Sequence, residues 1–283
     1  PDASILTGIE FDHADIFEDL DQIKDAFCKY VSLIRPEGVI LVKHGDINIQ
    51  DVLGGAVCKV ETYGYLDGAD WLIGDYRFEA GYCYFSLSYQ GVKKANFQLA
   101  MIGQHNAENA ASVAALCLKL GVTVDEINSA FKNFEGIKRR QEVVGVKNGV
   151  TVLDDFAHHP TAIRKTLEAV KEAYPGQRLW AVFEPRSATS KRKVFEQDFP
   201  DSFLVADRVI IAGLFAPEKI SEDERLDPEG VVNCLREKGC DAHFIREVDD
   251  IVAFMAENTE SGDVVLVMSS GGFGDIHQKI LGQ

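Results

Sequence analysis

The second half of the chain alternates between short apolar runs and amphipathic stretches, and this alternation constrains the fold more than any other feature. The apolar runs have the length of buried strands and lie at 151–153, 179–183, 208–212, 243–245 and 263–267. Residues 162–173 have the spacing of an amphipathic helix, and helical stretches also separate the later runs. Strands that alternate with helices form a parallel sheet with helices on both faces, so we predict an α/β fold.

The first half combines α/β features with a run of short alternating segments. Its expected elements are strands at 5–9 and 38–42 and helices at 21–33, 103–118 and about 124–131. Between residues 58 and 99, apolar and polar residues alternate in four segments separated by turns, which predicts antiparallel hairpins. The pattern changes at Lys138-Arg139-Arg140. We therefore predict one domain over 1–138 and a second over 139–283, with a hinge at the basic run.

The bulk composition excludes several classes of protein. A length of 283 residues suits about two domains. The net charge of −16 disfavours nonspecific nucleic-acid binding, which needs a basic surface. The six cysteines have neither a CxxC pair nor zinc spacing, so we expect reduced thiols in a cytoplasmic protein. No apolar run reaches the ~20 residues of a membrane helix.

The amino terminus of the chain carries no expected signal peptide, because acidic residues occur throughout its first fifteen positions. The chain begins at Pro1 and at once enters an expected strand. We therefore expect further structure upstream in a longer protein. We also expect a monomer or a weak homo-oligomer.

One eight-residue string concentrates titratable groups: Asp154-Asp155-Phe156-Ala157-His158-His159-Pro160-Thr161. It follows an expected buried strand and precedes an expected helix. Ligands of open α/β sheets bind at the carboxyl ends of strands, which favours a functional site here. The alternative is structural, with Pro160 in the first turn of a capped helix and the aspartates solvated.

Four other clusters lie at ends of expected elements. Asn106 and Asn109 share a helix face beside His105, which suits an adenine edge, although helix capping explains them equally well. Arg186 follows a strand, where it suits a substrate carboxylate or a surface salt bridge. Residues 12–15 form either a magnesium-binding loop or an ordinary turn, and residues 269–274 form a glycine-rich loop that could bind an anion.

Taken in order, these clusters resemble the Mur ligases. The matching strings are Asp12-His13-Ala14-Asp15, Gly103-Gln104-His105-Asn106 with Asn109, Arg139-Arg140, Asp154 to Thr161, Glu184-Pro185-Arg186-Ser187 and Ser269 to Gly274. Members of this family have a UDP-sugar domain, a central P-loop ATPase domain and a Rossmann-like C-terminal domain. The resemblance implies that this chain holds the later part of the central domain followed by the C-terminal domain. The sequence has no GxxxxGK[ST] phosphate loop.

Within the family, Phe156 to Thr161 and Glu184 to Ser187 resemble the murein peptide ligases. These recycling enzymes of the peptidoglycan pathway use ATP and Mg²⁺ to join L-alanyl-γ-D-glutamyl-meso-diaminopimelate to UDP-N-acetylmuramate through an acyl phosphate. The alternatives are a UDP-N-acetylmuramate–L-alanine ligase, a noncatalytic nucleotide- or muropeptide-binding fragment, and a domain that acts only in assembly. The chain alone is expected to be inactive, since the phosphate loop is missing from it.

The resemblance also implies roles by position. His13 is expected to be a Mg²⁺ ligand, and Cys28 replaces the carbamylated lysine of several relatives. Catalytic roles are implied for His158 and Arg186, of which Arg186 would also bind a substrate carboxylate. The remaining expected contacts are to nucleotide, by His105, Asn106, Asn109, Arg140 and Asp155, and to substrate, by His159, Ser269 and Gly271.

Overall fold

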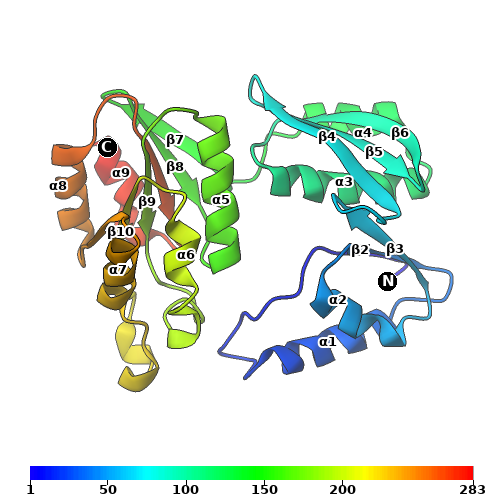
Figure 1. Cartoon of the computed structure of the whole chain (residues 1–283), viewed down its shortest axis with the longest axis horizontal. Helices are drawn as coiled ribbons and strands as arrows, with labels where there is room; N and C mark the ends of the chain where they lie inside the picture. The colour runs from blue at the N-terminus through cyan, green and yellow to red at the C-terminus, as the bar shows by residue number, and fades with distance from the viewer. Residues whose placement is uncertain (283) are drawn as a thin grey trace. The chain divides into compact units, whose positions relative to one another are not determined.

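A computed structural model describes residues 1–282 of the chain. These residues fall into two compact units, which meet in the sequence between Gly136 and Ile137. Each unit is built on its own six-stranded sheet (Figure 1). Among residues 1–282, every helix is too short or too polar to cross a membrane.

The sheet of the first unit follows the order of the chain. Its strands are β1 (Ala3–Leu6), β2 (Val39–Lys43), β3 (Lys59–Gly64), β4 (Trp71–Glu79), β5 (Tyr82–Tyr89) and β6 (Val92–Leu99). Strands β4 to β6 form the expected antiparallel hairpins. The same prediction is wrong for β3, which pairs in parallel with both β2 and β4. Alternation reports which faces of a strand are buried and does not specify the direction of its neighbours.

Helices cover both faces of this first sheet. They are α1 (Leu20–Ser32), α2 (Ile47–Val52), α3 (Gln104–Lys119) and α4 (Val124–Lys132). In β2, Ile40 and Val42 join the core formed with α1 and α2, whereas Leu41 joins the core formed with α3 and α4. Strand β1 ends at Leu6 rather than at residue 9, but Ile9 still lies in the core, which explains the longer apolar pattern.

The sheet of the second unit has the strand order β11-β10-β9-β12-β8-β7. Its strands are β7 (Glu142–Lys147), β8 (Val150–Asp155), β9 (Leu179–Phe183), β10 (Arg208–Ile211), β11 (Asp241–Phe244) and β12 (Val264–Met268). The expected parallel sheet is confirmed for β8 to β12. Strand β7 instead pairs antiparallel with β8. Asn148 and Gly149 connect the two strands with φ angles of 52° and 80°, as a tight hairpin turn requires.

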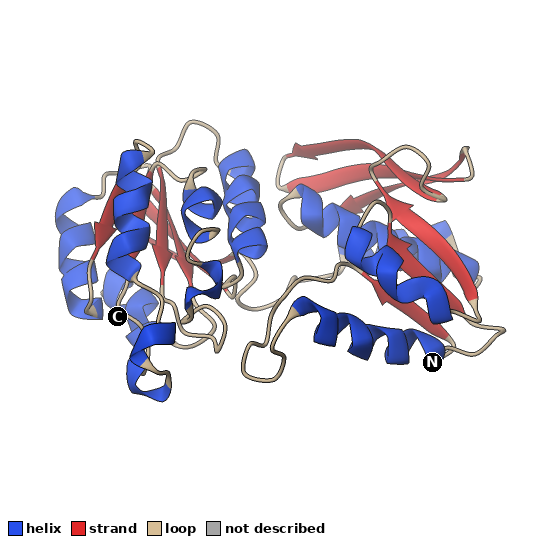
Figure 2. Cartoon of the chain, turned by 60° about the horizontal axis from the view of Figure 1, so that its bottom comes forward, coloured by secondary structure: helices blue, strands red, loops and turns tan. Residues whose placement is uncertain are grey.

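Helices also lie on both sides of the second sheet (Figure 2). They are α5 (Pro160–Ala173), α6 (Phe199–Phe203), α7 (Pro228–Glu237), α8 (Val248–Asn258) and α9 (Ile276–Leu281). Trp180 and Val182 of β9 share a core with α8 and α9, while Phe183 packs on Phe199 and Phe203 of α6. Helix α5, which follows β8, packs against α6, whereas α9, which follows the neighbouring strand β12, packs on the opposite face, so the two connections leave the sheet on opposite sides. Ligands of open α/β sheets bind at such a point.

Candidate functional site

Two aspartates, Asp154 and Asp155, lie at the carboxyl end of β8, and Asp155 is completely buried. Asp155 is 0% exposed. Its Oδ2 accepts hydrogen bonds from the backbone N of Gln141 at 2.9 Å and from Nε2 of the same residue at 2.7 Å, and its Oδ1 accepts from Ala157 N at 2.7 Å. Burial raises the pKa of Asp155, although these hydrogen bonds and the positive charge of Arg140 oppose the rise. Asp155 therefore anchors the start of the second unit to β8, and its predicted nucleotide contact stays a prediction.

Arg139 connects the end of β8 to the loop after β12. Its Nε donates to Asp154 Oδ2 at 3.2 Å, and its Nη2 donates to the carbonyls of Ser269 and Gly271 at 2.5 and 2.7 Å. Its guanidinium also lies 5.2 Å from the centre of the Phe156 ring. The basic run is thus not an entirely solvated hinge, because its middle residue holds the glycine-rich loop in place.

The glycine-rich loop also makes contact with the end of β9. Ser269 Oγ donates to Glu184 Oε2 at 2.6 Å and accepts from Gly271 N at 3.0 Å. Strands β8 and β9 are not neighbours in the sheet, because β12 lies between them. The ends of all three strands still converge, since Ser269 N donates to the carbonyl of Asp155 at 3.2 Å.

The guanidinium of Arg186 contacts Phe215 and Gly271. Its guanidinium carbon lies 3.5 Å from the centre of the Phe215 ring. On the other side its Nε lies so close to Gly271 that a Cβ there would be only 1.9 Å away. An ion pair with Glu184 at 3.5 Å is longer than a good hydrogen bond, and a quarter of the Arg186 side chain remains exposed. This arrangement offers the planar donor edge of a cation to an anionic ligand.

The two histidines of the β8–α5 connection have different surroundings. His159 is the N-cap of α5, where its Nδ1 accepts from Thr161 N at 3.2 Å and its ring lies 4.6 Å from that of Phe195. The structural interpretation, with Pro160 in the first helical turn, is therefore confirmed for this residue. His158 Nδ1 lies 2.9 Å from the carbonyl oxygen of Phe156. Because a carbonyl can only accept a hydrogen bond, this contact favours the tautomer with hydrogen on Nδ1.

In the first unit, the predicted nucleotide-binding residues lie at the start of α3. The N-cap is Gly103, with φ of 91°, so neither His105 nor Asn106 is the N-cap residue of α3. Asn106 Nδ2 donates to the Ile102 carbonyl at 2.8 Å. Asn109 is exposed three positions further on. The contacts of these residues with a nucleotide remain predictions.

The predicted magnesium ligand, His13, is exposed in the loop between β1 and α1. Its φ is 57°, and its carbonyl accepts from Ile16 N and Phe17 N, so this segment forms a tight turn. Within residues 1–282, no three His, Cys, Asp or Glu side chains converge as a metal site. The described residues therefore form no ready cage for Mg²⁺.

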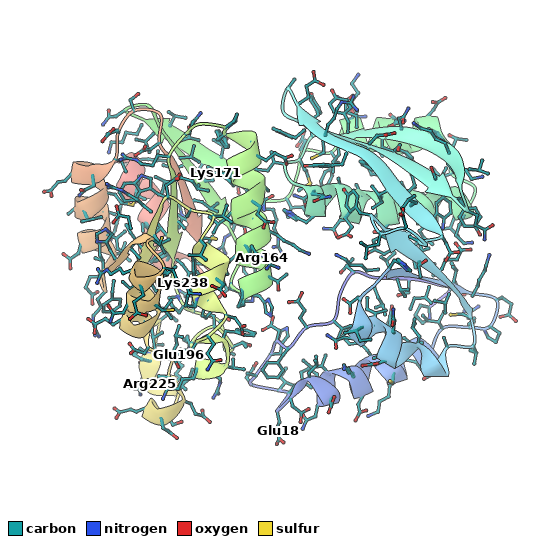
Figure 3. All side chains as sticks on the ribbon, in the orientation of Figure 1. Glu18, Arg164, Lys171, Glu196, Arg225 and Lys238 are labelled. Carbon is teal, nitrogen blue, oxygen red and sulfur yellow. The ribbon has the colours of Figure 1, made fainter. Side chains whose placement is uncertain are left out.

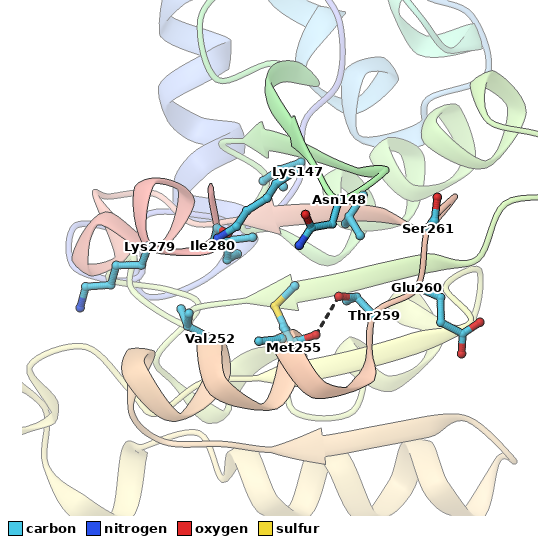
Figure 4. Close-up of a pocket in the computed structure, with 12 residues that line it drawn as sticks. Lys147, Asn148, Val252, Met255, Thr259, Glu260, Ser261, Lys279 and Ile280 are labelled. Carbon is cyan, nitrogen blue, oxygen red and sulfur yellow. Dashed lines mark hydrogen bonds between the residues drawn. The ribbon is translucent and has the colours of Figure 1, made fainter. Parts of the chain in front are cut away.

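A cavity of about 180 Å³ lies at the opposite end of the second sheet, between the β7–β8 turn, α8 and α9 (Figure 4). Two of its polar side chains form hydrogen bonds within the protein. Thr259 Oγ1 donates to the Met255 carbonyl at 2.7 Å, and Lys147 Nζ donates to the Ile280 carbonyl at 3.0 Å. This cavity is thus separate from the strand ends that carry the predicted site residues.

Comparison with known families identifies the class of protein. Residues 1–117 match the Mur ligase middle domain, and residues 139–271 match the Mur ligase glutamate ligase domain. The chain belongs to the Mur ligase family. The predicted family and the predicted α/β fold class are both confirmed.

Several curated relatives match nearly the whole chain. A UDP-N-acetylmuramate–L-alanine ligase from Caldanaerobacter subterraneus is 35% identical over 99% of this chain and 61% of its own length. Further curated relatives carry the same name. The chain thus spans about three fifths of the curated relatives that it matches.

Solved structures extend the comparison. A murein peptide ligase from Psychrobacter arcticus has a TM-score of 0.70 and 31% identity, over 100% of this chain and 57% of that one. A MurF ligase from Thermotoga maritima, solved with ADP, has a TM-score of 0.75 and 18% identity, over 100% of this chain and 61% of that one. The second likeness supports the fold only.

Two residues in the loops that follow β9 and β10 carry little or no sequence signal for a role at the site. Phe215 supports Arg186 from the loop after β10, 29 positions away in the chain. Lys191 lies in the loop after β9, where it is 7% exposed. Its place in the short basic run 191–193 is a weak signal, because such runs are usually solvated.

Proposed function

We propose that the complete protein is an ATP-dependent ligase that forms an amide bond between the carboxylate of UDP-N-acetylmuramate and an amine. The observation that carries this proposal is the match of both family domains along the chain. In the proposed reaction the carboxylate attacks the γ-phosphorus of ATP, and ADP leaves. The amine then attacks the resulting acyl phosphate, and phosphate leaves from a tetrahedral intermediate as the amine loses a proton.

The first candidate for the amine is L-alanine. The curated relatives that match the chain are named UDP-N-acetylmuramate–L-alanine ligases, and these names favour this acceptor over the tripeptide. The proposal places the acceptor carboxylate at Arg186, because its guanidinium is oriented by Phe215 and Gly271. Such positioning would hold the amine near the acyl phosphate and lower the entropic cost of their reaction.

The second candidate is the tripeptide L-alanyl-γ-D-glutamyl-meso-diaminopimelate. The string Glu184-Pro185-Arg186-Ser187 favours it, and so does the likeness to the Psychrobacter arcticus murein peptide ligase at 31% identity. The tripeptide assignment would place the protein in peptidoglycan recycling, and the alanine assignment would place it in peptidoglycan synthesis. Both assign the same acyl donor and the same use of ATP. The predicted roles of His158 and of the metal ligand His13 belong to this proposal.

The deciding experiment measures ADP release and the mass of the product. The complete gene product is supplied with ATP, Mg²⁺, UDP-N-acetylmuramate and either L-alanine or the tripeptide. Turnover with one acceptor assigns the branch, and the absence of turnover with both would overturn the ligase proposal.

An Arg186→Met variant tests the acceptor site within the same assay. We expect its KM for the acceptor to rise about tenfold or more, the typical cost of one charge-assisted hydrogen bond. Arg164→Met is the matched control, because Arg164 is exposed on α5 (Figure 3). Equal KM values for the two variants would exclude Arg186 from acceptor binding.

A further inference from the structure

Two buried polar atoms face each other between β8 and α9. One is Oδ1 of Asp154, at the carboxyl end of β8, and the other is Nε2 of His277, in α9. They lie 3.4 Å apart, and neither has a hydrogen-bond partner within residues 1–282. A buried polar atom without a partner costs free energy, so these two atoms favour a closer contact with each other.

The backbone that precedes His277 is held in an unusual conformation. Phe273 and Asp275 both have left-handed backbone, with φ angles of 44° and 57°. Such a conformation costs free energy for residues with a side chain, so it persists only where neighbouring contacts hold it. The buried side chains of Phe273 and Ile276 supply such contacts, since both belong to the core shared with β8 and β12. His277 therefore starts from a defined backbone position.

Asp154 has a donor on only one of its two oxygens. Its Oδ2 accepts from Arg139 Nε at 3.2 Å, whereas His277 Nε2 lies near Oδ1 without a hydrogen bond. Glu142 is opposite Asp154 in the register of β7 and β8, and its Oε2 accepts from Arg139 N at 2.8 Å. Because a carboxylate only accepts hydrogen bonds, both atoms are satisfied when His277 carries hydrogen on Nε2 and lies about 0.5 Å closer.

From Asp154 the contacts continue to the proposed acceptor site. Arg139 uses Nε to bind Asp154 and Nη2 to bind the carbonyl of Gly271 at 2.7 Å. The backbone of Gly271 lies against Arg186, with no room for a Cβ between them. A donor on Oδ1 fixes the Asp154 carboxylate with Oδ2 toward Arg139. His277 thus supports the position of Arg186 through this series of contacts.

We propose that His277 is a positioning residue for the acyl acceptor, which acts through Asp154 and Arg139 on the glycine-rich loop and thereby on Arg186. The inference rests on the proposed ligase function and deepens it, because it adds a residue that controls the acceptor site. Nε2 of His277 is buried, so its effect on the acceptor is indirect. The proposal applies to L-alanine and to the tripeptide alike, since both carry a carboxylate.

The first test measures acceptor KM in the complete gene product, with the acceptor that the wild type uses. We expect His277→Leu to raise this KM about fivefold, the usual contribution of one hydrogen bond, while the KM for ATP stays within about twofold. His277→Gln should restore most of the affinity, because an amide nitrogen can donate to Asp154 in place of Nε2. Gln278→Leu is the matched control, because Gln278 is exposed on the same helix. An unchanged acceptor KM in His277→Leu would overturn the inference.

A double-mutant cycle separates positioning from a general loss of structure. In an Arg186→Met background the acceptor no longer depends on the guanidinium, so His277→Leu should raise the acceptor KM little further. Kinetics are measured below the melting temperature of every variant, so that unfolding does not imitate weaker binding. A full additional rise in the Arg186→Met background would show that His277 acts by another route, and the inference would fail.

Amide hydrogen exchange tests the same contacts without turnover. Ser269 N donates to the Asp155 carbonyl at 3.2 Å, and Gly271 N donates to Ser269 Oγ at 3.0 Å. We expect His277→Leu to speed exchange at these two amides about fivefold, while amides of β9 and β10 keep their rates. Equal exchange at both amides in the variant and the wild type would contradict the proposed support of the loop.

The outcomes also separate this inference from the proposed function. If the wild type ligates an acceptor and His277→Leu keeps both its acceptor KM and its exchange rates, only the inference fails. If the wild type uses neither acceptor, the ligase proposal fails, and the role of His277 toward an acceptor fails with it. Exchange at Ser269 and Gly271 then still decides whether His277 holds the loop.

Discussion

The guanidinium of Arg186 lies directly against the backbone of Gly271, so that any Cβ at position 271 would be 1.9 Å from Nε. Two loops that are 85 residues apart in the chain thus fit together through the lack of a side chain on one of them. The glycine is required here for close approach rather than for a turn. The position of the Arg186 cation therefore depends on the glycine-rich loop.

Gly271→Ala is expected to displace Arg186 from the Phe215 ring and raise the acceptor KM about tenfold, since the guanidinium no longer meets the carboxylate. Gly272→Ala is the control, because a Cβ there meets nothing within 4 Å and its φ is −75°. Steady-state kinetics with the complete gene product measures both. An unchanged KM in Gly271→Ala would show that Arg186 can move without loss of binding.

Arg139→Ala is expected to destabilise the second unit by about 2 kcal/mol, because three partly buried hydrogen bonds to Asp154, Ser269 and Gly271 are lost. Arg139→Lys should recover little, since an ammonium cannot reproduce the fork of a guanidinium. Thermal unfolding of the chain measures the loss. The exposed neighbour serves as reference, and Lys138→Ala should stay within about 0.5 kcal/mol of the wild type.

Glu61 should give the first unit a marked acid sensitivity. Burial alone would raise the pKa of Glu61, but hydrogen bonds from Lys119, Lys59, Trp71 and Tyr89 outweigh it and lower the pKa from 4.5 to about 2. A lowered pKa stabilises the folded state above pH 4.5, and this contribution is lost as the pH falls from 4.5 toward 2. Its size is on the order of 3 kcal/mol.

Glu61→Gln is therefore expected to be less stable than the wild type at pH 7, and the difference should shrink toward pH 2. Amide hydrogen exchange in β3 and β4 follows the first unit specifically. The control is Glu79→Gln, whose carboxylate is 70% exposed and lies 3.5 Å from Arg77, so it should change stability little at either pH. A constant difference across the pH range would rule out the proposed linkage.

Substitutions can distinguish the helix-capping role of His159 from its predicted role in substrate binding. His159→Ala should destabilise α5 by about 1 kcal/mol, since the N-cap bond to Thr161 N is lost. His159→Asn should recover part of that stability, because asparagine is a favourable N-cap residue. We expect both variants to lose activity with the acceptor. Full activity in His159→Asn would leave this residue a helix cap only.

Much of the fold follows from local pattern, but the pairing of the strands does not. Alternation placed strands near 58–99 and 151–267, and each has a counterpart in the structure. The direction of β3 and the antiparallel β7 were not predictable, because a period of two residues reports buried faces only. The position of β12 between β8 and β9 was likewise not predictable, because it depends on how all the strands pack together.

Some features of the candidate site also follow from the local sequence, whereas others depend on the tertiary structure. By itself the sequence determined the family, the strand-end positions of Asp154 to Thr161 and of Arg186, and the glycine-rich loop, because each is a local string. Only the tertiary structure decided that Arg139 bonds to Gly271 and that Phe215 lies against Arg186. These relationships join residues far apart in the chain or depend on what surrounds a side chain, and burial, charge and contact at such distances exist only once the sheet has assembled.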